Sequence, residues 1–433
     1  MQDARGHVAC PAVPRPAPRA EIALSDDGAD PEGYGEQTRA VHLPLPEPLE
    51  QRPLGLPVHR TSTFAFATAQ DYADVLGFRK PGYSYSRIEN PTVVAFARAV
   101  AALEGHGVDG PVAADAFASG MAAIATVLLT LCRAGANVVA PRALYGGTYG
   151  VLTADLARFG VETRLVDGGD LSAVRAAVDA DTAVLWAETL ANPTMAVADL
   201  PALAGVARES GVPLVVDSTF ASPAVCRPLE HGVDLVVHSA TKYISGHSDV
   251  TGGVVVGRPE LVERVRGARI NLGGSLSPDD AFLLHRGLAT LPLRVERQCA
   301  SALAYAQALS RHPRVARVDY PGLPGHRDHD LARRLFDSGP AGTRYGAVVT
   351  VTPAGGRPAG LQFCDRLRLA TIATSLGGHH TVVSHAASTT HRQFDDAALA
   401  AAGIDPGAVR VSIGLEDVGD LIADAVHALD GLD

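Results

Sequence analysis

The residues best suited to chemistry follow two neighbouring apolar runs of the sequence. Asp217 ends the run PLVVD, and Lys242 comes shortly after the run VDLVVHS. If both runs are parallel strands of one sheet, their carboxyl ends lie at the same edge, where open α/β sheets bind ligands. A carboxylate and an amine then approach one ligand from adjacent strands, and Ser239 and Thr241 place two hydroxyl groups beside the amine.

Pyridoxal 5'-phosphate (PLP) requires this combination of groups. A lysine amine attaches its aldehyde, and an acid beside the pyridine nitrogen keeps the ring protonated as an electron sink. A helix N-terminus and hydroxyl groups bind its phosphate. The start of a predicted helix offers free N–H groups for that phosphate, at Ser119, Gly120 and Met121. Tyr145 follows the short run NVVAP and can stack on the ring or relay protons.

Each of these features has an ordinary explanation when it is taken alone. A lysine after a strand is usually a solvated surface residue, and a strand-end aspartate often caps a helix. Ser119 could be a simple N-cap and Tyr145 a core residue. Their coincidence at successive strand ends of one sheet favours a cofactor site.

The composition excludes several other classes of protein. The net charge of -10 and pI near 5.9 argue against a nucleic-acid or anionic-membrane surface. No apolar run is long enough to span a membrane. The five cysteines are scattered without a CxxC pair, which argues against a disulfide framework or a structural zinc site. Because prolines interrupt the N-terminus where a signal peptide needs an apolar core, we expect a cytoplasmic protein.

The regular alternation of strand and helix patterns begins near residue 110. Short, nearly continuous apolar strands with helices between them indicate a mostly parallel, doubly wound α/β sheet covered on both faces. We expect one buried helix from Ser119 to Gly135 and one long helix across 283–309, with a smaller α+β domain after it. The predicted strands are NVVAP, VETRLVD, TAVLWAET, PLVVD, VDLVVHS and GGVVVG in the larger domain, and VARVDY, GAVVTVTP, ATIATSLG and VRVSIGLE in the smaller one.

Four regions follow from these patterns. Residues 1–35 are expected to be a disordered or loose extension, because they are rich in proline, alanine and glycine. Residues 36–100 form an N-terminal arm that contacts a neighbouring subunit. Residues 101–285 form the large PLP-binding domain, and residues 286–433 form the small domain.

A family resemblance then extends over most of the chain, from residue 38 to the last helix. The segment VVHSATKYISGHSDVTGGVVVG (236–257) resembles the PLP-attachment signature of the Cys/Met-metabolism enzymes. These enzymes include cystathionine γ-synthase, cystathionine γ-lyase, methionine γ-lyase and O-acetylhomoserine sulfhydrylase. Further matching blocks stand in family order: YSRIENPT, SGMAAI, LYGGTYG, ETLANPT, VVDSTFASP, RGLATLPLR, SLGG and VRVSIGLED.

The resemblance implies fold type I, the fold of aspartate aminotransferase, and a role for each matching residue. Lys242 would hold PLP and move protons, Asp217 would pair with the pyridine nitrogen, and Tyr145 would stack on the ring. Asn192 would contact the 3'-oxygen of PLP, and Arg410 would bind the substrate carboxylate with Ser375 nearby. The phosphate would be held by Ser119, Gly120, Met121, Ser239 and Thr241.

The resemblance also implies an oligomer. Tyr85 and Arg87 match residues that reach the phosphate of a neighbouring subunit's cofactor. The minimal active unit would then be a homodimer, and the family usually forms homotetramers.

Several positions depart from the family pattern. Gly147 stands where methionine γ-lyases commonly have a cysteine, and Arg269 and Ile270 replace a lysine–aspartate pair, which argues against a dedicated methionine γ-lyase. His380 stands where many members have a glutamate, and Ala386 replaces a proline. We expect His380 and its histidine neighbours to line the substrate channel or to be structural, with no metal, because no acid or cysteine completes a site.

Three functions remain open from the sequence. The first is PLP-dependent γ-elimination or γ-replacement on a sulfur-containing or O-acyl homoserine-type amino acid, including an O-acetylhomoserine sulfhydrylase with a thiol co-substrate. The second is another PLP reaction, such as β-elimination or γ-substitution by a non-sulfur nucleophile in specialised metabolism. The third is a non-catalytic PLP-binding protein, which the presence of Lys242, Asp217, Tyr145 and Arg410 disfavours.

Overall fold

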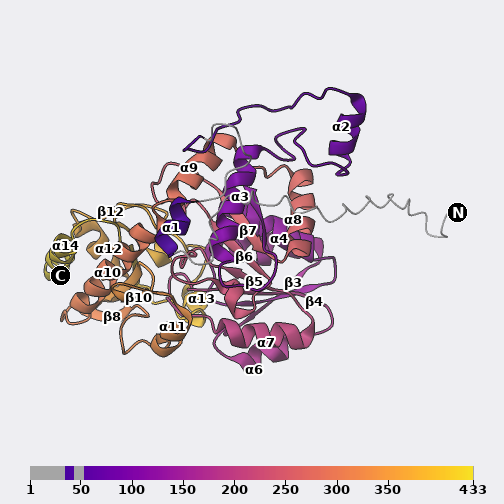
Figure 1. Cartoon of the computed structure of the whole chain (residues 1–433). Helices are drawn as coiled ribbons and strands as arrows, with labels where there is room; N and C mark the ends of the chain where they lie inside the picture. Colours follow the sequence, from indigo (N-terminus) through magenta and orange to yellow (C-terminus); the bar gives the residue numbers. More distant parts are fainter. Residues whose placement is uncertain (1–34, 43–52, 433) are drawn as a thin grey trace.

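The computed structural model describes residues 35–42 and 53–432. The predicted N-terminal extension therefore lies outside the described residues, apart from Gly35, and so does part of the proline-rich stretch that follows it. Figure 1 shows a larger body built around one sheet, a smaller C-terminal part beside it, and a projecting segment that carries helix α2.

A seven-stranded sheet forms the centre of the larger body. Its strands lie in the order β1-β7-β6-β5-β4-β2-β3. Pairs from β3 to β6 are parallel, whereas β7 runs antiparallel to both β6 and β1. The bounds are β1 Ala113–Phe117, β2 Asn137–Pro141, β3 Glu162–Val166, β4 Thr182–Glu188, β5 Leu214–Asp217, β6 Leu235–Ser239 and β7 Gly253–Gly257. The prediction of a mostly parallel sheet is confirmed.

Helices cover both faces of this sheet. Helices α4 and α8 share one buried apolar cluster with it, and α3, α7 and α9 share the other. Two-sided cover explains why the strands are almost entirely apolar and not alternating. These helices are α3 Pro91–Glu104, α4 Gly120–Leu131, α7 Leu200–Ser210, α8 Pro259–Leu272 and α9 Pro278–Leu288. Shorter helical segments are α1 Glu36–Val41, α2 Ala69–Leu76, α5 Gly146–Gly150, η2 Val151–Asp155, η3 Ala157–Phe159, α6 Leu171–Ala177 and η4 Pro228–His231.

Two helix predictions were wrong in their bounds. Helix α4 ends at Leu131, because Cys132 takes an extended conformation before the turn that contains Gly135. The expected long helix is divided into α9 and α10 (Leu291–Leu309). Pro292 lies in the first turn of α10, where its missing N–H is tolerated, whereas a helix interior would lose a hydrogen bond there. Strand β1 was not predicted, because AADAF lacks the β-branched residues typical of strands.

The C-terminal part contains a second sheet of five strands, in the order β12-β13-β14-β11-β8. Its bounds are β8 Val315–Asp319, β11 Val348–Pro353, β12 Thr371–Ile372, β13 Val382–His385 and β14 Val409–Ser412. The predicted strand ATIATSLG is reduced to the two residues of β12, and β13 was not predicted. The accompanying elements are β9 Ser338–Gly339, β10 Gly342–Thr343, α11 His329–Leu335, α12 Gly356–Arg366, η5 Ala386–Ser388, α13 Asp396–Ala401 and α14 Val418–Asp430.

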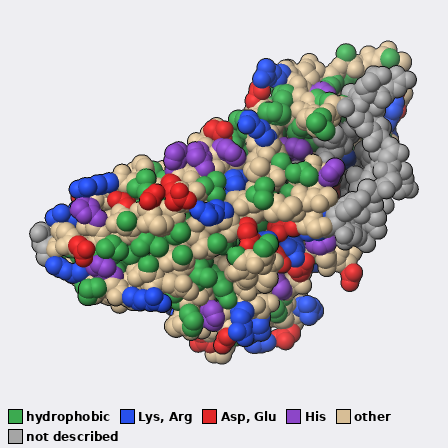
Figure 2. All heavy atoms as spheres, turned by 60° about the vertical axis from the view of Figure 1, so that its left-hand side comes forward, with side chains coloured by type: hydrophobic (Ala, Val, Ile, Leu, Met, Phe, Trp, Pro, Cys, Tyr) green, Lys and Arg blue, Asp and Glu red, His purple; other side chains and the backbone are tan. Residues whose placement is uncertain are grey.

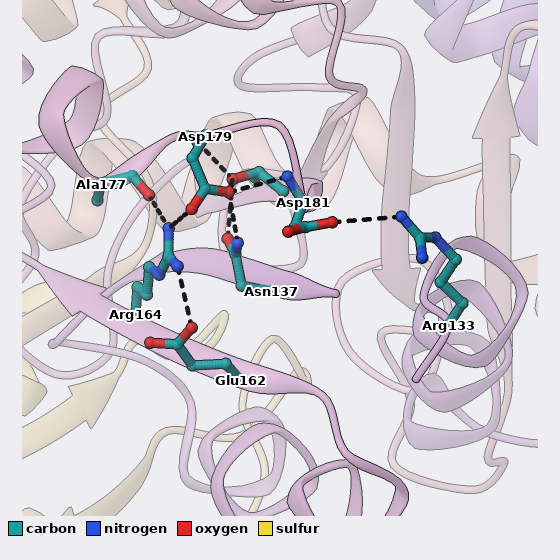
Figure 3. A network of polar contacts seen from close by, with 8 residues as sticks. Arg133, Asn137, Glu162, Arg164, Ala177, Asp179 and Asp181 are labelled. Carbon is teal, nitrogen blue, oxygen red and sulfur yellow. Dashed lines mark hydrogen bonds and ion pairs between the residues drawn. The ribbon is translucent and has the colours of Figure 1, made fainter. Parts of the chain in front are cut away.

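The amino ends of the central strands carry a polar network that is separate from the strand ends predicted to hold a cofactor. Asn137 begins β2, donates to Asp179 and accepts a hydrogen bond from Thr182, the first residue of β4 (Figure 3). Arg164 forms ion pairs with Asp179 and Glu162. This network joins β2, β3 and β4 at their amino ends and leaves their carboxyl ends for other contacts.

The surface, the helices and the cysteines give no sign of a further specialised feature among the described residues. Basic and acidic side chains are interspersed over the face in Figure 2. No described helix is long and apolar enough to cross a membrane. Within the described ranges the cysteines are all free thiols, at positions 132, 226, 299 and 364.

Candidate active site

The carboxyl ends of four adjacent strands place the predicted site residues at one edge of the large sheet. Tyr145 follows β2, Asn192 follows β4, Asp217 ends β5, and Lys242 follows β6 in a tight turn. This arrangement agrees with the rule that open α/β sheets bind ligands beyond the carboxyl ends of their strands.

Lys242 is the amine at the centre of the group. Its Nζ donates a 2.8 Å hydrogen bond to Ser375 Oγ, which belongs to the C-terminal part of the chain. Burial and the nearby Arg410 cation lower the pKa of Lys242 from 10.5 to about 8, although the charge of Asp217 opposes this effect. About a tenth of the amine is therefore neutral, and nucleophilic, at pH 7.

Arg410 joins the two sheets at the site. It lies on β14, where both neighbouring strands fix its backbone, and its side chain is buried. Its Nη2 donates to the carbonyl oxygen of Ser375 at 2.9 Å, and its Nη1 donates to Asn192 Oδ1 at 3.3 Å. Burial lowers the pKa of Arg410 to about 10, so the guanidinium stays charged at neutral pH.

Ser375 has an unusual backbone. Its φ of 83° lies in the left-handed region, which is costly for a residue with a side chain. This conformation accompanies two contacts, from Lys242 to the hydroxyl and from Arg410 to the carbonyl oxygen. Strained residues held by their surroundings in this way are concentrated at functional sites.

Asp217 supplies the buried carboxylate of the site. Its Oδ1 accepts a 3.0 Å hydrogen bond from the backbone N–H of Thr219. Burial raises the pKa of Asp217, while hydrogen bonds from Thr219 and the charge of Lys242 oppose the increase. A cationic partner at this carboxylate would favour its charged form, because opposite charges a few ångströms apart stabilise each other.

The N-terminus of α4 lies against the end of β6, and free N–H groups at a helix N-terminus can bind an anion. A Cβ atom at Gly120 would lie 2.6 Å from Cβ of Ser239, so only glycine permits this approach. Ser119 caps the helix by accepting from the N–H of Ala122. Thr241 is engaged elsewhere, since its hydroxyl exchanges hydrogen bonds with the backbone of Gly252.

Tyr145 is the most exposed member of the group, with 40% of its surface accessible to solvent. Its ring lies against Gly147, where an added Cβ would be 2.6 Å from Cε1 of Tyr145 and 2.8 Å from Sδ of Met121. The glycine found at position 147 therefore sets how closely the phenol and the methionine approach.

Three predicted site residues lie apart from this group. Tyr85 and Arg87 are exposed on the projecting segment, with the guanidinium 5.5 Å from the centre of the tyrosine ring. Arg87 also donates to the carbonyl oxygen of Ile270 at 2.5 Å. The side chain of His380 is exposed and its ring lies 4.2 Å from that of His379, without a hydrogen bond to Lys242 among the described residues. No group of metal-ligating side chains occurs in the described ranges.

The sequence interpretation missed two buried residues of the site. Glu188 ends β4 beside Asp217 and accepts hydrogen bonds from the N–H groups of Tyr145 and Asn192. His391 contacts the carbonyl oxygen of Leu144 through Nε2 at 3.1 Å. Glu188 could have been found by the rule that found Asp217, because it too ends an apolar run.

The site fits PLP in its donor set. Asn192 Nδ2 and Arg410 Nε are buried and have no hydrogen-bond partner among the described residues. Together with the amine, the carboxylate and the glycine-lined helix N-terminus, they offer polar groups for the ring oxygen, the pyridine nitrogen, the phosphate and a substrate carboxylate.

Comparison with known proteins identifies similar chains over nearly the whole length. Residues 37–430 match the profile of the Cys/Met metabolism PLP-dependent enzymes. The chain is 42% identical to an L-methionine gamma-lyase of Pseudomonas putida, covering 91% of this chain and 97% of that protein. It is 41% identical to an O-succinylhomoserine sulfhydrylase of Pseudomonas aeruginosa, covering 86% and 90%.

A solved structure agrees with these sequence relationships. An O-acetylhomoserine (thiol)-lyase of Campylobacter jejuni superimposes with a TM-score of 0.86 at 30% identity, covering 92% of this chain and 100% of that one. That structure carries a pyridoxyl group on a lysine. The prediction of fold type I is confirmed.

Proposed function

Because this chain belongs to the Cys/Met metabolism family of PLP-dependent enzymes, it catalyses γ-elimination or γ-replacement on sulfur-containing or O-acyl homoserine-type amino acids, and we propose that Lys242, Asp217 and Tyr145 carry the reaction. The observation that supports this assignment best is the hydrogen-bonded series from Lys242 through Ser375 and Arg410 to Asn192. It joins an amine, a carboxylate-binding cation and a buried amide at one sheet edge.

When bound, PLP supplies an electron sink that stabilises negative charge at the substrate α-carbon. Asp217 would hold the pyridine nitrogen in its protonated form, and Ser239 with the N–H groups of Ser119, Gly120 and Met121 would hold the phosphate. Asn192 would donate from Nδ2 to the 3'-oxygen. Thr241 keeps its place among the predicted phosphate ligands only if its hydroxyl turns away from Gly252.

The chain's own groups then move the protons. Lys242 Nζ would take the proton from the substrate Cα and act again at Cβ, since it is the amine at this sheet edge and its lowered pKa suits a base near neutral pH. Arg410 would bind the substrate α-carboxylate with its planar guanidinium, close to Ser375. Tyr145 would donate a proton from its hydroxyl to the leaving group at Cγ. His380 as a substrate-binding residue stays a prediction.

We further propose that the active unit is a homodimer, which pairs into a tetramer. Tyr85 and Arg87 face outward from the projecting segment, and their hydroxyl and guanidinium would reach the phosphate of the partner's cofactor. A groove of about 390 Å³ on the same segment is lined by Phe64, Phe66, Tyr72 and Leu76 together with Tyr85. Tyr72, Leu76 and Tyr85 are exposed there, and exposed apolar patches mark protein–protein contacts. A cytoplasmic location stays a prediction from the prolines that interrupt the N-terminus.

A specific observation favours γ-replacement as the main reaction over elimination from methionine. The ring of Tyr145 lies directly on Gly147, so a side chain at position 147 would have to displace it. The cysteine expected in dedicated methionine γ-lyases would therefore require the side chains of Tyr145 and Met121 to shift from their present positions. A thiol co-substrate would complete such a replacement.

The site assignment is tested by reducing the PLP-loaded protein with borohydride and locating the label by mass spectrometry. The chain contains two lysines, Lys80 and Lys242, so a label on one lysine is easily told from a label on the other. We expect the pyridoxyl group on Lys242. A label on Lys80, or no label, would overturn the assignment.

The reaction type is tested by offering methionine, cystathionine, homocysteine, O-acetylhomoserine and O-succinylhomoserine, each with and without sulfide. We expect sulfide to divert an O-acyl homoserine into homocysteine. Release of 2-oxobutyrate from methionine at a higher rate would instead make elimination the main reaction. Pyruvate as the keto acid would identify a β-lyase.

A further inference from the structure

The buried carboxyl group of Glu188 contacts the backbone of two residues of the candidate site. Glu188 is 6% exposed and ends β4. Its Oε1 accepts a 2.7 Å hydrogen bond from the backbone N–H of Tyr145, which lies on a different strand connection. Its Oε2 accepts a 3.3 Å hydrogen bond from the N–H of Asn192. One side chain thus holds the backbone of two residues assigned to the cofactor.

Glu188 is also the neighbour of the third cofactor-binding group. Strands β4 and β5 are parallel, and Glu188 and Asp217 occupy the same register position. Both carboxyl groups are buried. Among the described residues no ion pair joins Glu188 to a basic side chain, so the backbone N–H groups are its main partners. Burying a carboxyl group is costly unless hydrogen bonds compensate for the lost water, and here the N–H groups of two site residues supply them.

We propose that Glu188 is a positioning residue, which sets the backbone of Tyr145 and Asn192 against Asp217 and thereby fixes the tilt of the PLP ring. Tyr145 would stack on the ring, Asn192 would donate a hydrogen bond to its 3'-oxygen, and Asp217 would pair with its nitrogen. These three contacts come from three strand ends, and Glu188 is the side chain that links two of them directly and the third by adjacency. The inference rests on the proposed cofactor-binding roles.

The protonation of Glu188 decides which substitution copies it best. Burial and the charge of Asp217 raise the pKa of Glu188 to about 8. Near pH 7 the carboxyl is therefore mostly neutral, and glutamine matches it in shape and charge. Glu188→Gln keeps an oxygen that accepts from the backbone N–H of Tyr145. Its amide NH2 group, however, would face the backbone N–H of Asn192, so two donors would meet there. Glu188→Ala removes both contacts.

The test compares these variants with Asn137→Ala. Asn137 (Figure 3) is buried at the opposite end of the same two strands, and its hydrogen bond from Thr182 links β2 to β4. Its loss weakens the same part of the sheet without touching the proposed cofactor contacts. The dissociation constant of PLP is read from the fluorescence of Trp186, the single tryptophan, which is buried on β4. The visible circular dichroism per bound PLP reports the ring's orientation.

We expect Glu188→Ala to weaken PLP binding roughly 10-fold to 100-fold and to change the visible circular dichroism of the PLP that still binds. We expect Glu188→Gln to show the same changes to a smaller degree, and Asn137→Ala to lower the melting temperature with the dichroism unchanged. A lower melting temperature in the Glu188 variants, without a change in PLP affinity or in visible circular dichroism, would overturn the inference.

Two further outcomes keep the test decisive. If Glu188→Ala does not fold, Glu188→Gln carries the test, and wild-type affinity and dichroism in that variant would overturn the inference. If wild type and Asn137→Ala fail to attach PLP at Lys242, the proposed function itself fails, and the role of Glu188 fails with it. The two failures are therefore distinguishable by the behaviour of the control.

Discussion

The lowered pKa of Lys242 is a prediction that can be measured on the protein without its cofactor. At pH 7 an amine with a pKa of about 8 is roughly 9% neutral, whereas one with a pKa of 10.5 is roughly 0.03% neutral. The difference in reactive amine is about 300-fold. Such a difference would make Lys242 the lysine that a small reagent acylates faster at neutral pH, provided that the reagent reaches it.

Lys80 provides an internal control in the same molecule. It is the second of the two lysines, it is exposed, and its hydrogen bond and ion pair with Asp71 raise its pKa above 10.5. We would treat the PLP-free protein with trace acetic anhydride at a series of pH values and measure acetylation of each lysine by mass spectrometry. Each profile is scaled to its own plateau, so the difference in accessibility does not enter.

The labelling of Lys242 should rise to half its plateau near pH 8, and that of Lys80 only above pH 10.5. Two variants test the cause in opposite directions. Arg410→Gln removes a nearby cation and should move the Lys242 profile to higher pH, whereas Asp217→Asn removes a nearby anion and should move it to lower pH. Equal profiles for the two lysines, or shifts of the same sign in both variants, would refute this account of the site's electrostatics.

Other substitutions probe the remaining groups. Arg87→Ala should raise the dissociation constant of PLP about 10-fold to 100-fold, and the exposed Arg158→Ala should leave it unchanged; an active monomer would contradict the shared site. Asp217→Asn should lower kcat/KM by about 10² or more while PLP still attaches to the lysine, and a rate near wild type would mean that another acid serves the ring. Arg269→Met would leave Asp115 buried without its closest cation and free the carbonyl groups of Arg87 and Ile88, which should cost about 3 kcal/mol of stability in denaturant unfolding.

The sequence predicted the strand ends of the site well, because apolar runs are strong signals and their ends carry the polar residues. Asp217 and Lys242 both stand at such ends. Strand β1 could not be read from AADAF, since alanine has no strand preference and only pairing with β7 fixes it there. The break between α9 and α10 was signalled by Pro292, and the continuous apolar pattern around it concealed that signal.

The contacts between distant segments were beyond pattern reasoning. Nothing in the spacing of Ser375 and Lys242 indicates that their side chains touch, since that contact depends on how the small sheet packs against the large one. The resemblance suggested that Ser375 lies near Arg410, but not that Arg410 also reaches Asn192. Glu188 was missed because attention at the end of its strand went to Asn192 in the following turn and not to the glutamate.

Ser375 allows the strain at the junction of the two sheets to be separated from its chemistry. Its hydroxyl accepts from Lys242, and its left-handed φ of 83° turns the carbonyl oxygen toward Arg410. Ser375→Ala removes the hydroxyl and keeps the unfavourable conformation, whereas Ser375→Gly removes the hydroxyl and relieves it. The glycine variant should therefore be the more stable of the two by about 1 kcal/mol.

The two variants should lose activity to the same degree if the hydroxyl is what serves the reaction. Equal kcat/KM values would mean that activity depends on the hydroxyl group that contacts Lys242. Unequal midpoints of denaturant unfolding would mean that the strained backbone, which holds the carbonyl oxygen toward Arg410, affects stability alone. A glycine variant that is clearly less active than the alanine variant would reverse this reasoning. In that case the rigid backbone at position 375 would itself help to position Arg410 for the substrate carboxylate. A glycine at 375 is more flexible and would no longer hold its carbonyl oxygen toward Arg410.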